Sequence, residues 1–153
     1  AAGNPHAFQF PRTFLRDGRL DFSFSGLKTA VLYAAHGQNV AKAPAPPAGP
    51  FRANLAASFQ QAVVEVLTEK SRQALHRTGL KRLAVGGGVA ANRALRTALE
   101  RMADEEAAEL LIPPMVLCTD NAAMAAMAVE KWRAGDFAPL DLDAVPTYRP
   151  GRG

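Results

Sequence analysis

Three consecutive glycines, Gly86, Gly87 and Gly88, follow the apolar segment 81–85 and precede a helical pattern. Because glycine has no Cβ, such a run lets the backbone approach a ligand closely. The first turn of the following helix offers free N–H groups and a partial positive charge, which suit a phosphate or acyl-phosphate group. Asn92 lies in that turn, and its amide can donate and accept hydrogen bonds to a ribose or a base edge. A tight turn chosen for packing explains the same glycines, so both interpretations stay open.

Asp120 is the second candidate, within the segment CTDNAAM at 118–124. A carboxylate after a short apolar stretch and at a helix N-terminus lies where α/β proteins bind ligands, at the carboxyl ends of strands. Asp120 could ligate a metal, hold a ligand hydroxyl or cap the helix. The three interpretations stay open at this stage.

The histidines and the cysteine offer less chemistry. His6, His36 and His76 include no i, i+4 pair, and we expect them to be surface or loop residues. Cys118 is the single cysteine, which excludes an intrachain disulfide and a multi-cysteine zinc site. We expect it to be a small buried residue in a protein of the reducing cytoplasm.

The elements that must position these residues alternate between strand and helix patterns. Period-two alternation predicts a strand over 20–26, and apolar runs predict strands over 81–85 and 109–112. Helical spacing predicts helices over 25–35, 52–78, 90–107 and 120–134, with Ser25 and Thr119 as N-caps and Gly79 ending the longest helix. This order predicts an α/β layer structure with some parallel pairing.

The remaining segments read as connections. Residues 37–50 hold four prolines and two glycines, which predicts a flexible surface loop, and residues 136–153 read as an irregular tail. The sequence begins with Ala1, and residues 1–19 read as an extended connection. Two interpretations stay open, an ordinary flexible N-terminus after removal of the initiator methionine and the second half of a longer protein.

Composition sets the broad class. The 153 residues suffice for one ordinary domain, and 48% hydrophobic with 21% charged residues are typical of a globular protein. A net charge of +4 permits a nucleic-acid partner without demanding one. No apolar run is long enough to predict a membrane span, and the first residues lack a signal-peptide pattern.

Five segments together resemble the tRNA threonylcarbamoyladenosine transferase family, whose older name is the O-sialoglycoprotein endopeptidase or glycoprotease family. In order, they are FPR at 10–12, LDFSFSGLKTAV at 20–31, AASFQQAVVEVL at 56–67, GGGVAANRALR at 86–96 and CTDNAAM at 118–124. The resemblance covers nearly the whole chain but only the C-terminal half of the family's length. It implies one lobe of the actin-like ATPase fold, the ribonuclease H-like fold of sugar kinases and heat-shock chaperones, with a nucleotide cleft between two α/β lobes.

The resemblance also implies an activity. The family transfers a threonylcarbamoyl group from threonylcarbamoyl-AMP to N6 of the adenosine 3′ of the anticodon in tRNA. A separate synthase supplies the adenylate, and bacterial members act with an inactive paralogue and a small ATPase. We therefore expect tRNA and these proteins as partners. We expect this chain to be inactive when it is tested alone.

By motif, the resemblance places the ligand-contacting asparagine at Asn92, the nucleotide-facing glycines at Gly86 to Gly88, and the metal-binding aspartate at Asp120. The family's iron or zinc also needs two histidines at i, i+4 spacing. The histidines of this sequence cannot supply that pair, so we expect the two histidine ligands to lie in the N-terminal half of the family's chain. We therefore expect the metal site at Asp120 to be empty or weakly occupied in this chain. The catalytic residues and the general base stay unassigned.

Two other functions remain as alternatives. One is a metal-dependent endopeptidase, as the older family name says, although the sequence lacks the HExxH zinc motif. The other is a non-catalytic lobe that binds nucleotide or partner subunits through apolar faces.

Overall fold

The chain divides into two compact units, Ala1–Thr119 and Asp120–Gly153. The computed structural model describes residues 3–13, 15, 17–37 and 47–141, and each unit is considered by itself. Among these residues, no helix is both long enough and apolar enough to cross a membrane.

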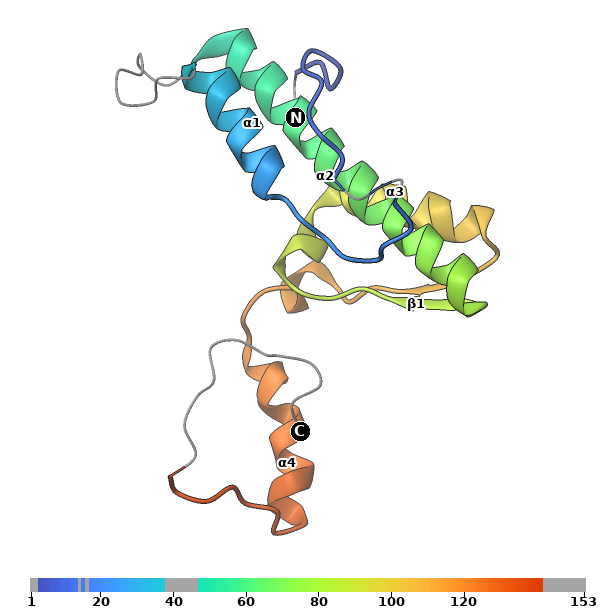
Figure 1. Ribbon diagram of the computed structural model, residues 1–153. Coiled ribbons are helices and arrows are strands. Elements are labelled where there is room, and N and C mark those ends of the chain that lie inside the picture. Colours follow the sequence, from blue (N-terminus) through green and yellow to red (C-terminus); the bar gives the residue numbers. More distant parts are fainter. Residues whose placement is uncertain (1–2, 14, 16, 38–46, 142–153) are drawn as a thin grey trace. The chain divides into compact units, whose positions relative to one another are not determined.

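In the described residues of the first unit, helices pack with a pair of parallel strands (Figure 1). Its helices are α1 at Ser25–His36, α2 at Gly49–Thr78 and α3 at Arg93–Glu105, and its strands are β1 at Arg82–Ala84 and β2 at Glu109–Leu111. The strands pair with Leu83 opposite Leu110. A parallel pair needs a crossover connection, which α3 supplies. The predicted α/β arrangement with parallel pairing is confirmed.

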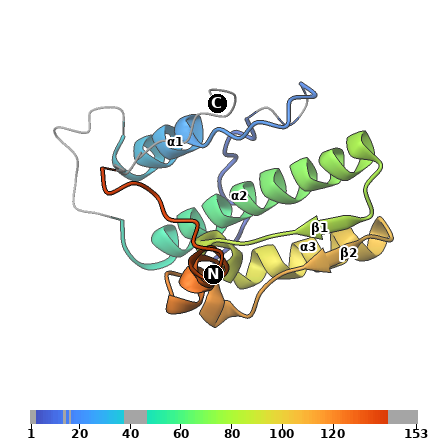
Figure 2. The ribbon, with the colours of Figure 1, turned by 90° about the horizontal axis from the view of Figure 1, so that it is seen from below.

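The larger core lies between the strand pair and the two helices α2 and α3, which lie side by side (Figures 1 and 2). Its buried members come from both helices and are Val64, Leu75, Leu95, Leu99 and Met102. Leu83 and Leu110, the central residues of the two strands, pack against them. Full burial of one such side chain stabilises the fold by about 1.5–3 kcal/mol, so this cluster holds the strands against the helices.

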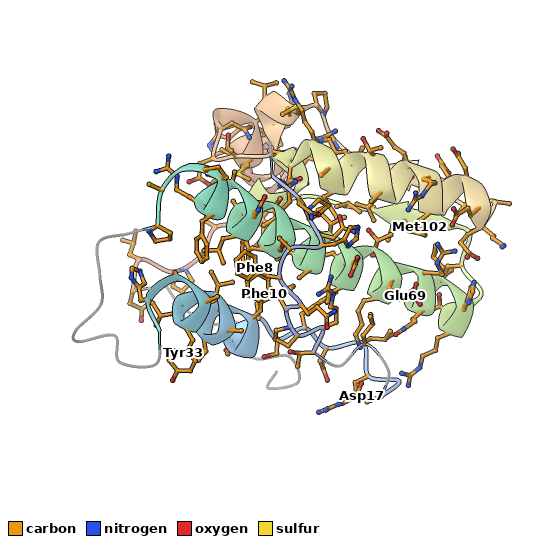
Figure 3. All side chains as sticks on the ribbon, turned by 90° about the horizontal axis from the view of Figure 1, so that it is seen from above. Phe8, Phe10, Asp17, Tyr33, Glu69 and Met102 are labelled. Atoms are coloured by element: carbon orange, nitrogen blue, oxygen red, sulfur yellow. The ribbon has the colours of Figure 1, made fainter. Side chains whose placement is uncertain are left out.

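The N-terminal segment runs along α2 and closes a second core. The backbone N–H of Asn4 donates to Asn54 Oδ1 at 2.8 Å, and that of Phe8 donates to Ser58 Oγ at 3.1 Å. Figure 3 shows Phe8 and Phe10 between α1 and α2. Phe10 is buried there with Leu27, Leu55 and Ala62, so the segment joins α1 to the long helix.

A buried lysine fastens the next part of this segment. The Lys70 side chain is fully buried, and its ammonium group donates to the backbone carbonyl of Arg19 and lies 3.9 Å from Asp17 Oδ1. A buried charge is tolerated only with such partners. Desolvation raises the pKa of Asp17, but hydrogen bonds from Arg19 and the charges of Arg19 and Lys70 outweigh it and leave that pKa below its ordinary value.

Most element predictions agree with the structure. α2 begins slightly earlier than predicted, at Gly49, and ends where Gly79 adopts the left-handed conformation with φ of 69°. The predicted helix from residue 90 begins instead with a short 3-10 turn, η2 at Gly88–Ala91, before α3. Of the loop predicted at 37–50, residues 49 and 50 belong to α2, and residues 38–46 lie outside the described residues.

The strand predicted at 20–26 is wrong. Residues 20–24 are described and lie outside any strand, and α1 starts at Ser25. The alternation does place Phe22 and Phe24 on one side, with rings stacked 6.5 Å apart. A strand also needs hydrogen bonds to a neighbouring strand, which alternation alone cannot supply. The N-cap prediction for Ser25 is wrong too, because Phe24 occupies the N-cap position of α1.

In the second unit the predicted helix over 120–134 is shorter. A 3-10 turn, η4 at Ala122–Ala125, leads into α4 at Ala126–Arg133. Asn121, rather than the predicted Thr119, caps the turn by accepting a hydrogen bond from Ala123 N at 3.0 Å. Residues 136–141 contain no helix or strand, as predicted, and the remaining tail, 142–153, lies outside the described residues.

Candidate functional site

The glycine turn follows β1 directly and is open to solvent. Gly86, Gly87 and Gly88 are all exposed, and a Cβ added at any of them would meet no described atom within 4 Å. Crowding by neighbouring atoms therefore does not explain these glycines. Only Gly87 requires glycine for its backbone, since its φ of 86° and ψ of 171° are strained for other residues. Free space above a bare backbone is what a ligand-binding turn needs.

A shallow apolar depression of about 460 Å³ lies beside this turn. It is formed where the two parallel strands end, by Ala84, Val85, Gly86, Leu111, Ile112 and Pro113. The carboxyl ends of parallel strands are the usual ligand-binding edge of an α/β sheet. The glycine turn and the depression therefore form one continuous candidate site through Gly86.

Asn92 connects this turn to two helices. Its Oδ1 accepts a hydrogen bond from Leu95 N at 3.1 Å, which makes it the N-cap of α3. Its Nδ2 donates to Gln60 Oε1 on α2 at 3.3 Å. The side chain is half-buried, so Asn92 has a structural role beside any contact with a ligand.

Sequence reasoning missed Arg96, one turn further along α3. Its Nε donates to Ala90 O at 2.6 Å, and one terminal nitrogen donates to Pro113 O at 2.5 Å. The same nitrogen lies 3.1 Å from Cys118 Sγ. Its i, i+4 spacing from Asn92 was the available signal. The partners at 113 and 118 come from folding across the sheet and could not be read from the sequence.

Cys118 is buried, as predicted, with 1% of its surface exposed. It follows η3, a 3-10 turn at Met115–Leu117 that contacts η2. Val89 of η2 and Val116 of η3 remain 60% and 75% exposed. Each of these two contacting turns therefore presents an exposed apolar side chain.

Asp120 is exposed and is the first residue of the second unit. The predicted site residues thus belong to two units, with the glycines and Asn92 in one and Asp120 in the other. No group of three or more His, Cys, Asp or Glu side chains that could hold a metal occurs in the described part of the chain. One carboxylate is too few ligands for iron or zinc, so these residues alone do not fit that metal.

The histidines do not change this result. His6 and His76 are exposed, as predicted for surface residues, whereas His36 is half-buried at the end of α1. His76 Nε2 nevertheless lies 2.5 Å from Glu106 Oε2, although the two residues are 30 positions apart in sequence. It joins α2 to the end of α3 and lies outside the candidate site.

Comparison with known proteins identifies the family of the chain. The family model described as TsaD, tRNA N6-adenosine threonylcarbamoyltransferase, matches residues 1–127. The match includes the glycine turn, Asn92 and Asp120. The chain belongs to this family.

Curated relatives carry the same name. A protein of Trichlorobacter lovleyi named tRNA N6-adenosine threonylcarbamoyltransferase is 50% identical over 147 residues, which is 95% of this chain and 42% of the relative. Proteins of the same name from Rhodopirellula baltica and Cereibacter sphaeroides are 45% and 48% identical, over 97% of this chain and 44% and 42% of their own lengths. The chain therefore spans less than half the length of these relatives.

Proposed function

We propose that this chain is the C-terminal portion of a tRNA threonylcarbamoyltransferase. The full-length enzyme transfers the threonylcarbamoyl group of threonylcarbamoyl-AMP to N6 of the adenosine 3′ of the anticodon. The observation that carries this proposal is the family match across residues 1–127, which includes the open glycine turn. Since the chain spans about 42% of the first relative, we expect it to be inactive alone.

The proposed architecture is one lobe of an actin-like ATPase fold. The parallel pair of β1 and β2, with α3 as the crossover, supports this assignment without being specific to it. In such a fold the nucleotide lies between two lobes, and this chain would contribute the face that carries the glycine turn.

The chemistry assigned to this face is binding and orientation. The N6 amine attacks the carbamoyl carbon, a C–N bond forms, the C–O bond to the phosphate breaks, AMP leaves, and N6 loses a proton. Backbone N–H groups of the glycine turn would hold the phosphate whose charge grows as AMP departs. Asn92 would contact the ribose or base edge through its amide. Positioning matters because an aromatic amine is a weak nucleophile.

Asp120 would supply one carboxylate ligand to an iron or zinc ion, with two histidines from outside this sequence. The partners that we propose for the full-length enzyme are tRNA, the inactive paralogue subunit, the small ATPase and the synthase that supplies threonylcarbamoyl-AMP. The enzyme would act in the cytoplasm. The support for these assignments is family membership.

A non-catalytic binding lobe is the second candidate, favoured by the exposed apolar side chains around the turn, such as Val89 and Val116. No observation on the described residues favours the endopeptidase.

The deciding experiment uses the full-length enzyme that contains this chain. It is incubated with its partner subunits, unmodified tRNA and threonylcarbamoyl-AMP labelled in threonine. Transfer of label to tRNA that falls in Asp120→Ala and Asn92→Ala, but not in the exposed variant Arg101→Met, supports the proposal. Absence of transfer by the wild type would refute it. Nucleotide binding without transfer would favour the non-catalytic lobe.

A further inference from the structure

Arg96 binds three acceptors from separate segments with one side chain. Ala90 O belongs to the turn that follows the glycines, Pro113 O follows β2, and Cys118 Sγ follows η3. A planar guanidinium can bind several acceptors in a fixed geometry, which a lysine cannot reproduce. The side chain is half-buried, so these hydrogen bonds are partly shielded from water.

The sulfur atom is held from a second direction. Cys118 Sγ lies 3.7 Å from Pro113 O and 3.6 Å from Pro114 O, and the residue is 1% exposed. Arg96 and the two proline carbonyls thus surround the thiol.

Other contacts hold α3 in place independently of Arg96. The helix packs on the core through Leu95, Leu99 and Met102, and Asn92 caps its N-terminus. All three acceptors of Arg96 lie instead in the turns that border the candidate site. Loss of this side chain would release those turns while leaving the core packing of the helix unchanged.

We propose that Arg96 is a positioning residue that locks the glycine turn to the 113–118 segment. This inference rests on the proposed transferase function. Arg96 touches no reacting atom in the proposal and acts through the two turns. Its removal should leave tRNA binding intact and misplace the glycine turn, which transfer needs.

The test compares full-length Arg96→Met and Arg96→Lys with Arg101→Met, a control on the same helix. The Arg101 side chain is 78% exposed and lies 3.7 Å from Glu105. The first measurement is kcat and KM for tRNA. The second is the rate of Cys118 alkylation, measured on the peptide that contains Cys118. The third is activity with added guanidinium chloride at a non-denaturing concentration.

We expect Arg96→Met to lower kcat by about 100-fold, the size of effect that a misplaced reacting group can have. KM for tRNA should stay near the wild-type value, Cys118 should be alkylated faster, and guanidinium ion should partly restore kcat. Arg96→Lys should also be slow, because an ammonium cannot bind the three acceptors together. Arg101→Met should match the wild type in every measurement.

Wild-type kcat in Arg96→Met would overturn the proposal. So would a loss of kcat in which Cys118 stays protected and guanidinium restores nothing. If Arg96→Met does not fold, Arg96→Lys decides, and wild-type kcat in that variant overturns the proposal. A wild type that transfers nothing would refute the proposed function itself, which separates the two failures.

Discussion

The Arg72 guanidinium of α2 lies 2.6 Å from Glu106 Oε1, and this ion pair joins α2 to the C-cap residue of α3. A second nitrogen of Arg72 lies 2.6 Å from Glu105, and His76 contacts the other oxygen of Glu106. Hydrogen bonds with His76 and Arg72 lower the pKa of Glu106 below its ordinary value of 4.5. Hydrogen bonds to Glu105 and Glu106 raise the pKa of Arg72.

A lowered carboxyl pKa makes stability depend on pH in a defined direction. As pH falls, Glu106 takes up its proton in the unfolded state before it does so in the folded state. Its contribution to the free energy of unfolding is therefore complete above about pH 4.5 and is lost as pH drops through its lower pKa in the folded state. Glu106→Gln should therefore unfold at a lower temperature than the wild type at pH 7, with a smaller difference at pH 3. Thermal unfolding at both pH values measures this. Glu109→Gln, which removes the exposed pair with Arg82, is the control and should change little.

Leu99 tests the core between α2, α3 and the strands. It is 2% exposed, so Leu99→Ala removes buried atoms and leaves a cavity. The free energy of unfolding should fall by about 2–5 kcal/mol. Leu80→Ala, at a residue 61% exposed, should change it by less than about 0.5 kcal/mol in the same denaturant titration. Equal losses in both variants would contradict the assigned core.

Alanine variants of the three glycines distinguish the effect of backbone strain from the effect of blocking a ligand. Gly87→Ala places a Cβ at φ of 86° and should cost about 1–3 kcal/mol of stability. Gly86→Ala and Gly88→Ala place a Cβ in open space and should leave the unfolding temperature nearly unchanged. If the turn binds a phosphate, all three variants should weaken AMP binding measured by calorimetry. Unchanged binding in Gly86→Ala and Gly88→Ala would contradict a ligand at the turn.

Asn92 allows its capping role to be separated from its proposed ligand contact. Asn92→Ala removes the bond to Leu95 N and should cost about 1 kcal/mol of stability. Asn92→Asp keeps a good N-cap and loses only the bond to Gln60 Oε1, so its stability should fall less than that of Asn92→Ala. The added negative charge should nevertheless weaken binding of AMP next to it. Wild-type AMP affinity in Asn92→Asp would place the ligand elsewhere.

Several elements could be predicted from local sequence because their causes are local. The apolar spacing over 52–78 and the following Gly79 predicted α2 and its end. The apolar runs at 81–85 and 109–112 predicted the positions of β1 and β2, and the glycine run predicted a turn between strand and helix. Side-chain periodicity and glycine conformation depend on residues within a few positions of each other.

Other features depended on partners distant in sequence. The alternation of Phe22 and Phe24 predicted a strand, but a strand forms only where another strand offers hydrogen bonds. The caps were ambiguous because Ser, Thr and Asn all cap well, and the choice of Asn121 over Thr119 follows from where the chain turns.

The sequence by itself determined the family, the elements that flank the glycine turn and the residue types at the candidate site. Tertiary structure alone decided that Arg96 meets Pro113 and Cys118, 17 and 22 positions away. It also decided that Asn92 reaches Gln60. Such contacts arise when the core between α2, α3 and the strands closes, because hydrophobic burial is non-directional and brings together residues that no local pattern pairs.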